Sequence, residues 1–296
     1  MKFTYKIDKR YEGMLLRDYL RDELHLSTRL IKKAKSPNGK LLINGVKKTV
    51  RYSLRVGDTL QIIFPPEEKS ESLRPEYIPL HIMYEDEHVL IVNKPSGMAT
   101  IPSQLYPSGT IANGILYYYE QSKLPYTIHI VTRLDKDTSG LVVVAKHQYC
   151  HSLLSTMQRK NELIREYEAV VTGHLDRKIG TIAAPIGRKT DSIIERTVTP
   201  TGKNAVTHYE VVHETGCLTL LRIRLETGRT HQIRVHFAHI GHPLVGDHLY
   251  GKEKKDIELL HRQALHCSYI RFVHPFTNKT IEVHSSLPDD VKKLLQ

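Results

Sequence analysis

Hydrophobic positions in the first 64 residues follow helical spacing and then strand spacing. Leu16, Leu20 and Leu24 recur at intervals that place them on one face of a helix. Ser27 can cap a second helix that begins at Thr28. The predicted strands of this part cover residues 41–46, which contain an Asn-Gly turn, and residues 59–64. The pattern therefore predicts a small α+β unit.

The rest of the chain alternates between strand-like and helix-like patterns, and the long strand-like runs outnumber the helical ones. Residues 65–77 contain three prolines, many charges and few apolar side chains, which is typical of a linker. We therefore predict a domain over residues 1–64, a linker over 65–77 and a second domain over 78–296. The second domain is predicted to be α+β with a large mixed or antiparallel sheet. Its predicted strands cover residues 82–84, 88–92, 141–145, 164–173, 204–213, 217–226 and 265–273, and its predicted helices cover residues 110–120 and 151–160.

Charged residues gather beside the most apolar of these strands, residues 141–145. If the segment from Arg133 to Asp137 is extended, its alternation places Arg133, Asp135 and Asp137 on one face. Residues 138–140 are predicted to form a tight turn, because hydroxyls bond the local backbone and glycine tolerates positive φ. This cluster fits either a solvated ion-pair hairpin or a catalytic site, and spacing alone does not choose between the two carboxylates.

An arginine lies among apolar residues further along the chain. Residues 221–226 alternate as a strand with one buried face, and a helix predicted from about Thr230 places Arg234 between Ile233 and Val235. A guanidinium buried in that position is costly unless it is paired with a carboxylate. We therefore expect Arg234 to point into a carboxylate pocket.

The positive charge of the chain is concentrated near its N-terminus. The formal charge is +11, and residues 1–64 contain 15 Lys or Arg and 6 Asp or Glu, so they contribute 15 − 6 = +9. A clustered positive field favours a polyanionic partner such as RNA over a merely solvated surface. Arg29, Lys32 and Lys33 share one face of the helix predicted from Thr28, and we expect them to contact RNA phosphates.

Several other classes of protein fit poorly. The chain has no apolar run long enough to span a membrane and no secretory leader, so we expect a cytoplasmic location. Its three cysteines form no CxxC pair, which disfavours a disulfide framework or a thiolate zinc site. Histidines are crowded over residues 231–248, but without the HExxH spacing of a metal site, so we expect no metal.

Three stretches carry a family resemblance. Residues 132–140 read Thr-Arg-Leu-Asp-Lys-Asp-Thr-Ser-Gly, residues 165–173 read Arg-Glu-Tyr-Glu-Ala-Val-Val-Thr-Gly, and residues 228–236 read Gly-Arg-Thr-His-Gln-Ile-Arg-Val-His. In order and spacing they resemble the central HRLDxxTSG motif, the tyrosine strand and the arginine helix of the RluA family of pseudouridine synthases. Asn93–Gly97 and Ala264–Cys267 agree as well, and the resemblance spans about residues 78–290. Thr132 departs from the family, which commonly has His there.

The resemblance implies a pseudouridine synthase fold with a bent central sheet and an isomerase that converts uridine in RNA to pseudouridine without a cofactor. It implies that Asp135 is the nucleophile or base and that Arg234 pairs with it. The matching positions also imply that Arg133 helps to flip the uridine out of the RNA, that Tyr167 stacks on the uracil and helps to remove the proton on carbon 5, and that Leu265 lines the uracil pocket.

Residues 1–64 resemble the RNA-binding module first seen in a ribosomal small-subunit protein, called the S-four-type module here. Family members with this module typically modify large-subunit ribosomal RNA, so we expect that substrate, a monomer, and no obligate protein or membrane partner. Transfer RNA is the alternative substrate. A non-catalytic ribosome-assembly protein and a glycosidase or nucleoside hydrolase are alternative functions, the latter because two carboxylates beside a glycosidic bond also suit hydrolysis. The sequence leaves open the target uridine, the covalent route, the oligomeric state and the effect of Thr132.

Overall fold

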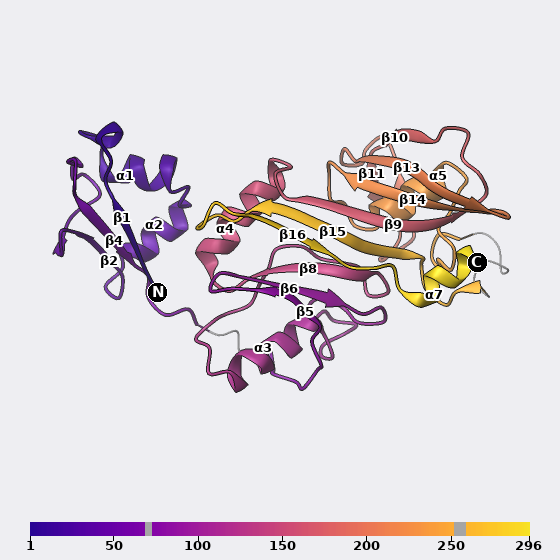
Figure 1. Cartoon of the computed structure of the whole chain (residues 1–296), viewed down its shortest axis with the longest axis horizontal. Helices are drawn as coiled ribbons and strands as arrows, with labels where there is room; N and C mark the ends of the chain where they lie inside the picture. The colour runs from indigo at the N-terminus through magenta and orange to yellow at the C-terminus, as the bar shows by residue number, and fades with distance from the viewer. Residues whose placement is uncertain (69–72, 252–258) are drawn as a thin grey trace.

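The computed structural model describes residues 1–68, 73–251 and 259–296 (Figure 1). In the described residues, the N-terminal module (residues 1–64) has a four-stranded antiparallel sheet in the order β1-β4-β2-β3. The strands are β1 (Lys2–Lys6), β2 (Lys40–Ile43), β3 (Val46–Lys47) and β4 (Thr59–Ile63), and the helical segments are Lys9–Tyr11, α1 (Leu16–Asp18) with its π-helical continuation Tyr19–Glu23, and α2 (Thr28–Ala34). Ser27 caps α2, as predicted, by accepting a hydrogen bond from the amide of Leu30. The strand β1 was not predicted.

The C-terminal domain (residues 78–296) is built on a large mixed sheet, which confirms the predicted α+β class. In the described residues, ten strands belong to it, in the order β10-β13-β14-β9-β15-β8-β6-β5, with β16 beside β15 and β7 beside β8. The strands β15 and β8 are parallel, whereas the other pairs are antiparallel. The bounds are β5 (Ile82–Glu85), β6 (Val89–Lys94), β7 (His129–Ile130), β8 (Ser139–Ala145), β9 (Ile164–Thr172), β10 (Ile179–Ala183), β13 (Val206–Thr215), β14 (Leu218–Leu225), β15 (Leu265–Val273) and β16 (Thr280–His284).

Helices cover parts of this sheet, and a separate hairpin extends from it (Figure 1). The hairpin consists of β11 (Ile186–Arg188) and β12 (Arg196–Val198). The helices are α3 (Ile111–Gln121), α4 (Gln148–Arg159), α5 (Gln232–His239) and α7 (Asp289–Lys292), followed by a 3-10 turn at Lys293–Leu295. The helix predicted over residues 151–160 therefore begins three residues earlier, because His147 accepts a hydrogen bond from the amide of Cys150 and caps α4.

The turn predicted at residues 138–140 was wrong. The chain turns at Lys136 and Asp137, where the amide of Thr138 donates to the carbonyl of Asp135 at 3.1 Å. Ser139 already belongs to β8. Gly140 does adopt the positive φ expected of a glycine, +114°, but within the strand, and it is also needed for a second reason. A Cβ on Gly140 would lie 2.3 Å from the carbonyl oxygen of Cys267, so the glycine permits the close approach of β8 and β15.

The described parts of the predicted linker lie against the C-terminal domain. The carboxylate of Glu67 contacts Nε2 of His129 at 2.6 Å and accepts a hydrogen bond from the amide of Gln148 at 2.7 Å. Further along, the side-chain amide of Asn113 donates to the carbonyl of Arg74 at 2.7 Å. These contacts bind both ends of the segment to the domain that follows it. The described residues at both ends of the segment therefore lie against the C-terminal domain.

Candidate active site

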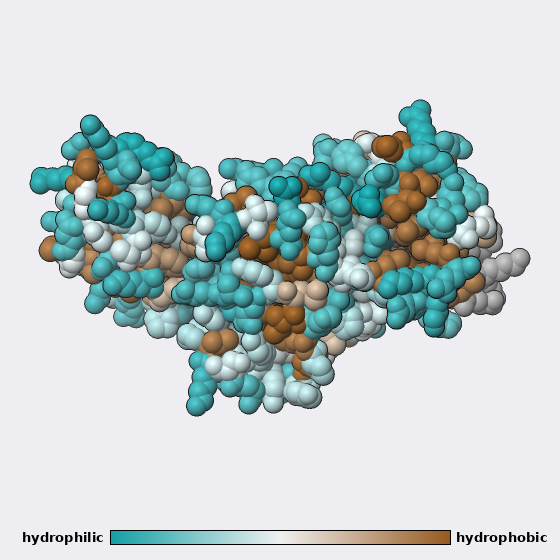
Figure 2. Space-filling model, viewed as in Figure 1, coloured by the Kyte–Doolittle hydropathy of each residue, from teal (hydrophilic) through white to brown (hydrophobic). Residues whose placement is uncertain are grey.

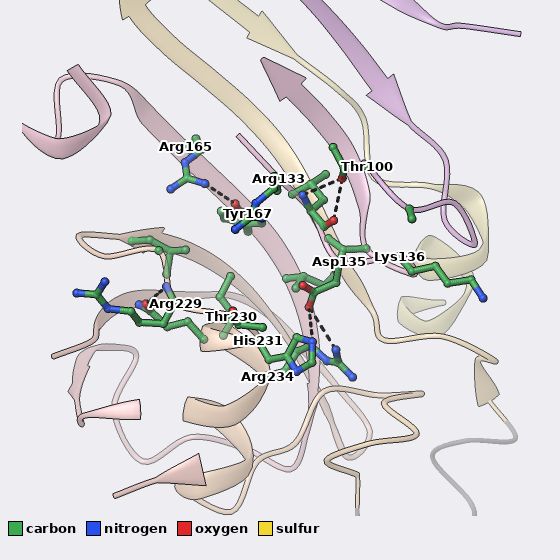
Figure 3. A pocket seen from close by; sticks show the side chains of 18 of the residues that line it. Thr100, Arg133, Asp135, Lys136, Arg165, Tyr167, Arg229, Thr230, His231 and Arg234 are labelled. Atoms are coloured by element: carbon green, nitrogen blue, oxygen red, sulfur yellow. Dashed lines mark hydrogen bonds and ion pairs between the residues drawn. The ribbon is translucent and has the colours of Figure 1, made fainter. Parts of the chain in front are cut away.

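A pocket of about 470 Å³ opens where β9, β14, β15 and the start of α5 approach the loop before β8 (Figure 3). All five residues proposed from the sequence for the site line this pocket, and they come from four separate segments. They are Arg133, Asp135, Tyr167, Arg234 and Leu265. Asp137 lies outside this lining. The fold therefore distinguishes the two carboxylates that the sequence spacing left equivalent.

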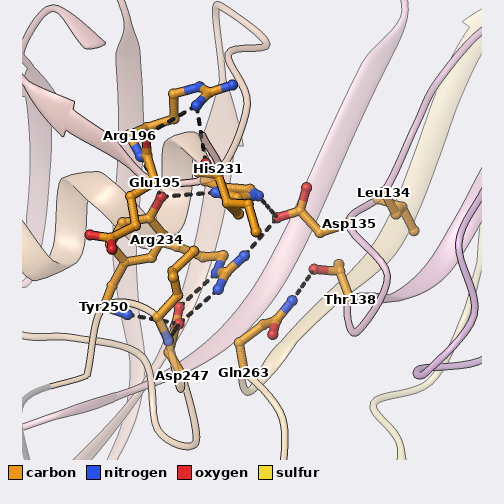
Figure 4. A network of polar contacts seen from close by, with 12 residues as sticks. Leu134, Asp135, Thr138, Glu195, Arg196, His231, Arg234, Asp247, Tyr250 and Gln263 are labelled. Atoms are coloured by element: carbon orange, nitrogen blue, oxygen red, sulfur yellow. Dashed lines mark hydrogen bonds and ion pairs between the residues drawn. The ribbon is translucent and has the colours of Figure 1, made fainter. Parts of the chain in front are cut away.

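Asp135 lies beside two nitrogen groups from α5 and its N-terminus. Its Oδ2 accepts a hydrogen bond from Nη1 of Arg234 at 3.2 Å and lies 3.8 Å from Nε2 of His231 (Figure 4). The carboxylate is 28% exposed, whereas the arginine side chain is only 9% exposed. Asp135 can therefore reach a bound nucleotide, while the arginine approaches it from the protein side.

The two-point contact of Arg234 is made with a different carboxylate, Asp247, which the sequence did not reveal. Nε and Nη2 of Arg234 donate to the two oxygens of Asp247 at 2.7 and 2.8 Å. Burial on its own lowers the pKa of Arg234, but the bonds to Asp247 and the charges of both aspartates outweigh it and raise the pKa. The fork therefore binds Asp247, and the remaining nitrogen is directed at Asp135.

His231 adopts an unusual backbone conformation at the start of α5. Its φ is +57°, in the left-handed region, and it occupies the position before the first helical residue, Gln232. The helix predicted from about Thr230 therefore begins two residues later. Nδ1 of His231 lies 2.8 Å from the hydroxyl of Tyr250, and burial lowers the pKa of the imidazole. A neutral ring, oriented by a tyrosine, thus stands next to Asp135.

The backbone around Asp135 is anchored by groups beneath it. Thr100 donates through Oγ1 to the carbonyl of Leu134 at 2.9 Å and accepts from the amide of Leu134 at 3.2 Å (Figure 3). The fully buried Lys94 donates to three backbone carbonyls, one of them Lys136 at 2.9 Å. Burial lowers the pKa of Lys94 to about 7, although the nearby aspartates oppose that shift. Lys94 is the last residue of β6, and its role in holding this loop was missed from the sequence.

Thr132, the departure from the family motif, has a structural role in this chain. Its side chain is 1% exposed, and Oγ1 accepts a hydrogen bond from the amide of Val143 at 2.9 Å. It therefore ties the loop to β8. Thr132 does not belong to the pocket lining.

Tyr167 forms the floor of the pocket on β9. Its ring is 4% exposed, and its hydroxyl accepts a hydrogen bond from Arg165 at 3.3 Å. Burial raises the pKa of this phenol, so at neutral pH it is protonated. A protonated phenol suits stacking and hydrogen bonding better than the removal of a proton. Leu265 is 4% exposed on the adjacent strand β15 and adds an apolar wall.

The predicted RNA-contacting residues divide into two groups. Arg133 is exposed at the pocket, and Arg29 and Lys32 are exposed on α2. Lys33 is half-buried, and its amine donates to Oε1 of Gln148 in α4 at 2.7 Å, so it connects the two domains. The N-terminal module also has a basic groove of about 520 Å³ that the sequence pattern did not indicate. The groove is lined by Ala34, Lys35, Leu41, Lys47, Lys48, Thr49, Val50 and Arg51.

The crowded histidines have separate partners. Within residues 1–68, 73–251 and 259–296, no group of three or more His, Cys, Asp or Glu side chains could hold a metal ion. His236 bonds Thr207 and the carbonyl of Ala184, while His242 bonds the carbonyl of Thr172. These histidines therefore serve packing. Free cysteines occur at Cys150 and Cys267, which are buried, and at Cys217, which is exposed.

Comparison with known proteins identifies the family. Residues 88–239 match the family model described as RNA pseudouridylate synthase, and the match includes the central motif, the tyrosine strand and the arginine helix. The chain belongs to this family. The resemblance to the RluA-type synthases is thereby confirmed, and the protein is an RNA pseudouridine synthase, an isomerase.

Relatives match both domains. The chain is 49% identical to "Uncharacterized RNA pseudouridine synthase YjbO" of Bacillus subtilis (strain 168), over 96% of this chain and 99% of the relative. It is 40% identical to "Ribosomal large subunit pseudouridine synthase D" of Escherichia coli (strain K12), over 87% and 82%. Among solved structures, "Human RNA Pseudouridylate Synthase Domain Containing 1" matches with a TM-score of 0.59 and 25% identity, over 70% of this chain and 83% of that one. No helix in the described residues is long and apolar enough to span a membrane.

Proposed function

We propose that this synthase isomerises uridine in large-subunit ribosomal RNA and that Asp135 is its nucleophile or base. The observation that carries the assignment is the position of Asp135, partly exposed in the pocket and hydrogen-bonded to a buried arginine. The proposed RNA class is supported by relatives whose names specify the ribosomal large subunit. Transfer RNA is the competing substrate, and it is included in the test below.

The proposed reaction needs few groups. The bond between the ribose anomeric carbon and nitrogen 1 of uracil breaks, the base turns, and the anomeric carbon joins carbon 5. Carbon 5 then loses its proton and nitrogen 1 gains one, so substrate and product are isomers and no cofactor is consumed. A carboxylate can attack carbon 6 of the uracil or the anomeric carbon, or it can act as a base at the sugar. Because Asp135 is the carboxylate in the pocket lining, it is our candidate for each of these roles.

The other pocket residues are proposed to present the nucleotide. A uridine inside folded RNA must be unstacked, which costs a few kcal/mol. Arg133 is exposed at the pocket and carries a planar guanidinium that can occupy the vacated stack. Tyr167 offers its ring to the uracil, Leu265 supplies an apolar wall, and Arg29 and Lys32 contact phosphates. Lys33 is proposed to join the domains rather than to bind RNA, because its amine already has a protein partner.

The test uses transcripts of ribosomal and transfer RNA labelled with tritium on uracil carbon 5. Formation of pseudouridine releases that tritium to water. We expect release from the large-subunit transcript by the wild type, and a loss of at least about 10²-fold in Asp135→Asn, because the residue performs the chemistry. Asp137→Asn is the matched control, since it removes an adjacent carboxylate outside the pocket. Release by Asp135→Asn at the wild-type rate would refute the assignment, and release from transfer RNA alone would refute the substrate class.

A further inference from the structure

The N-terminal module is docked onto α4 through specific contacts. Lys33 donates to Gln148, the first residue of α4, and the hydroxyl of Tyr149 donates to a backbone carbonyl of the module at 2.9 Å. The ring of Phe3 stacks on Phe276, with centroids 5.4 Å apart and planes inclined by 18°. Tyr149 is also part of the buried core of the module. The two domains therefore share one interface with both polar and aromatic contacts.

The helix α4 also reaches the active-site pocket at its other end. It has twelve residues, and Gln158, the last but one, lines the pocket that contains Asp135. Ten residue steps separate Gln148 from Gln158, which corresponds to about 15 Å along a helix axis. Docking on α4 thus sets a constant separation between the module and the reacting nucleotide.

Exposed cations lie at both ends of this spacer. Arg29 and Lys32 are exposed on α2, next to the residue that contacts Gln148. Arg159 and Lys160 are exposed at the C-terminal end of α4, immediately after the pocket residue Gln158. In Figure 2 the upper outline of the molecule is lower in the middle, between the N-terminal module and the far part of the C-terminal domain. In Figure 1, α4 lies next to the module.

We propose that α2 and α4 form one RNA-binding track, in which Arg29 and Lys32 bind the phosphates at one end and Arg159 and Lys160 bind them at the other. The ligand is a helical RNA segment that flanks the target uridine, because a length of about 15 Å covers only a few base pairs of an A-form helix, whose phosphates carry the charge that these cations bind. This inference rests on RNA being the substrate, as proposed above. It adds that the docked module, by fixing the distance to Asp135, selects which uridine is modified.

The first test reverses the charge at the pocket end of the track in the full-length protein. We expect the double variant Arg159→Glu/Lys160→Glu to raise KM for the ribosomal transcript more than tenfold, with the change in KM rather than in kcat. The matched control is Lys123→Glu/Arg177→Glu, which changes the net charge equally. Both control residues are exposed, one after α3 and the other beyond the end of β9 that is remote from α4. Equal KM values for the two double variants would overturn the proposal.

The second test separates docking from charge. Phe276 lies in a turn between β15 and β16 and stacks on Phe3, so Phe276→Ala weakens the interface without entering the sheet. We expect a larger radius of gyration in small-angle scattering and a KM raised more than tenfold. We also expect additional modified uridines, mapped by reverse transcription after carbodiimide labelling. Tyr77→Ala removes the exposed member of an aromatic pair elsewhere, Tyr77 and Tyr117, and should change none of these. An undocked Phe276→Ala protein with wild-type KM and target choice would overturn the proposal.

A failure of the proposed function is distinguishable from a failure of this track. If the wild type releases no tritium from ribosomal RNA, filter binding to the same transcript still compares Arg159→Glu/Lys160→Glu with its control. A selective loss of affinity in that assay supports the track without any turnover, whereas equal affinities overturn it.

Discussion

The site depends on a buried arginine whose strongest partner could not be predicted from motif spacing. The sequence indicated that Arg234 needs a carboxylate, and the family resemblance proposed Asp135. The structure adds Asp247, which is 1% exposed and lies thirteen residues after the arginine. Asp247 also accepts hydrogen bonds from the amides of Leu249 and Tyr250, so it closes its own loop. The available signal was a charged residue two positions after a buried apolar pair, Leu244 and Val245, because such a charge requires a partner.

Asp247 is therefore expected to act on catalysis through Arg234. In Asp247→Asn the fork loses its anionic partner, and breaking a buried pair costs about 3–5 kcal/mol. We expect lower stability in urea unfolding and a kcat for tritium release reduced at least tenfold in the folded fraction. Arg234→Lys should lose most activity as well, because an ammonium cannot bond both aspartates in this geometry. Near-normal turnover by Arg234→Lys would contradict the pairing.

A second arginine fork supplies the control for Asp247. Nε and Nη2 of Arg262 donate to the carboxylate of Asp290 in α7 at 2.7 and 2.9 Å. Asp290→Asn breaks a fork of the same geometry away from the pocket lining, at a carboxylate that is 45% exposed. It should reduce stability, by less than Asp247→Asn does, while the folded enzyme retains its kcat. Equal kcat losses in the two aspartate variants would mean that stability alone explains the effect of Asp247.

At the scale of elements, periodicity predicted the long strands and helices well and failed where a turn depended on tertiary contacts. Residues 265–273 were predicted as a strand and form β15 without change of bounds. The turn at Lys136 and Asp137 was assigned two residues too late, because its position depends on Lys94 and Thr100, which bond the loop from a distant segment. Serine, threonine and glycine suggested a turn at residues 138–140, but the parallel pairing with β15 extends Ser139 and Gly140 as strand.

The cap of α4 is expected to make the protein sensitive to acid. Nδ1 of His147 accepts from the amide of Cys150 at 3.1 Å, so its proton is on Nε2, which lies 3.0 Å from Nδ1 of His88. Burial lowers the pKa of His147 to about 3. The unfolded chain, with an ordinary histidine near pH 6.5, binds the proton first. The stability is therefore complete above about pH 6.5 and falls as the pH drops toward 3.

We predict that His147→Asn reduces this loss, because an asparagine oxygen still caps the helix but does not titrate. Between pH 7.5 and pH 5, the unfolding free energy of the wild type should fall by about 2 kcal/mol more than that of the variant. One proton taken up on unfolding costs about 1.4 kcal/mol for each pH unit below about pH 6.5. Urea unfolding at the two pH values measures the difference. His239→Asn, at an exposed position of α5, should follow the wild type, and parallel losses in all three proteins would exclude His147 as the titrating group.

For the whole molecule, the sequence predicted two domains with unequal charge but not how they are joined. Prolines and charges in residues 65–77 indicated a linker, yet Glu67 binds His129 and Gln148 of the C-terminal domain. Such contacts between distant residues leave no periodic signal in a sequence. The aromatic interface was missed for the same reason, since Phe3 and Phe276 lie far apart in the chain. Net charge, in contrast, is a sum over residues, so the formal charge of +9 for residues 1–64 follows from the sequence directly.

The basic groove of the N-terminal module is expected to control the salt dependence of RNA binding. Lys47 and Lys48 line it together with apolar residues that include Leu41 and Val50. Each phosphate contact that is lost should reduce the slope of log affinity against log salt by about 0.7–0.9. We therefore expect Lys47→Gln/Lys48→Gln to reduce that slope by about 1.4–1.8, measured by fluorescence anisotropy with a ribosomal transcript.

The interpretation of that slope depends on removing equal charge elsewhere. Lys123→Gln/Arg177→Gln lowers the net charge by the same amount, at two exposed positions of the C-terminal domain. If RNA responded only to the total charge, both double variants would reduce the slope equally. If the phosphates are bound in the groove, only Lys47→Gln/Lys48→Gln does so, because counterions are released where cations and phosphates meet. An unchanged slope in the groove variant would place the phosphate contacts outside this groove.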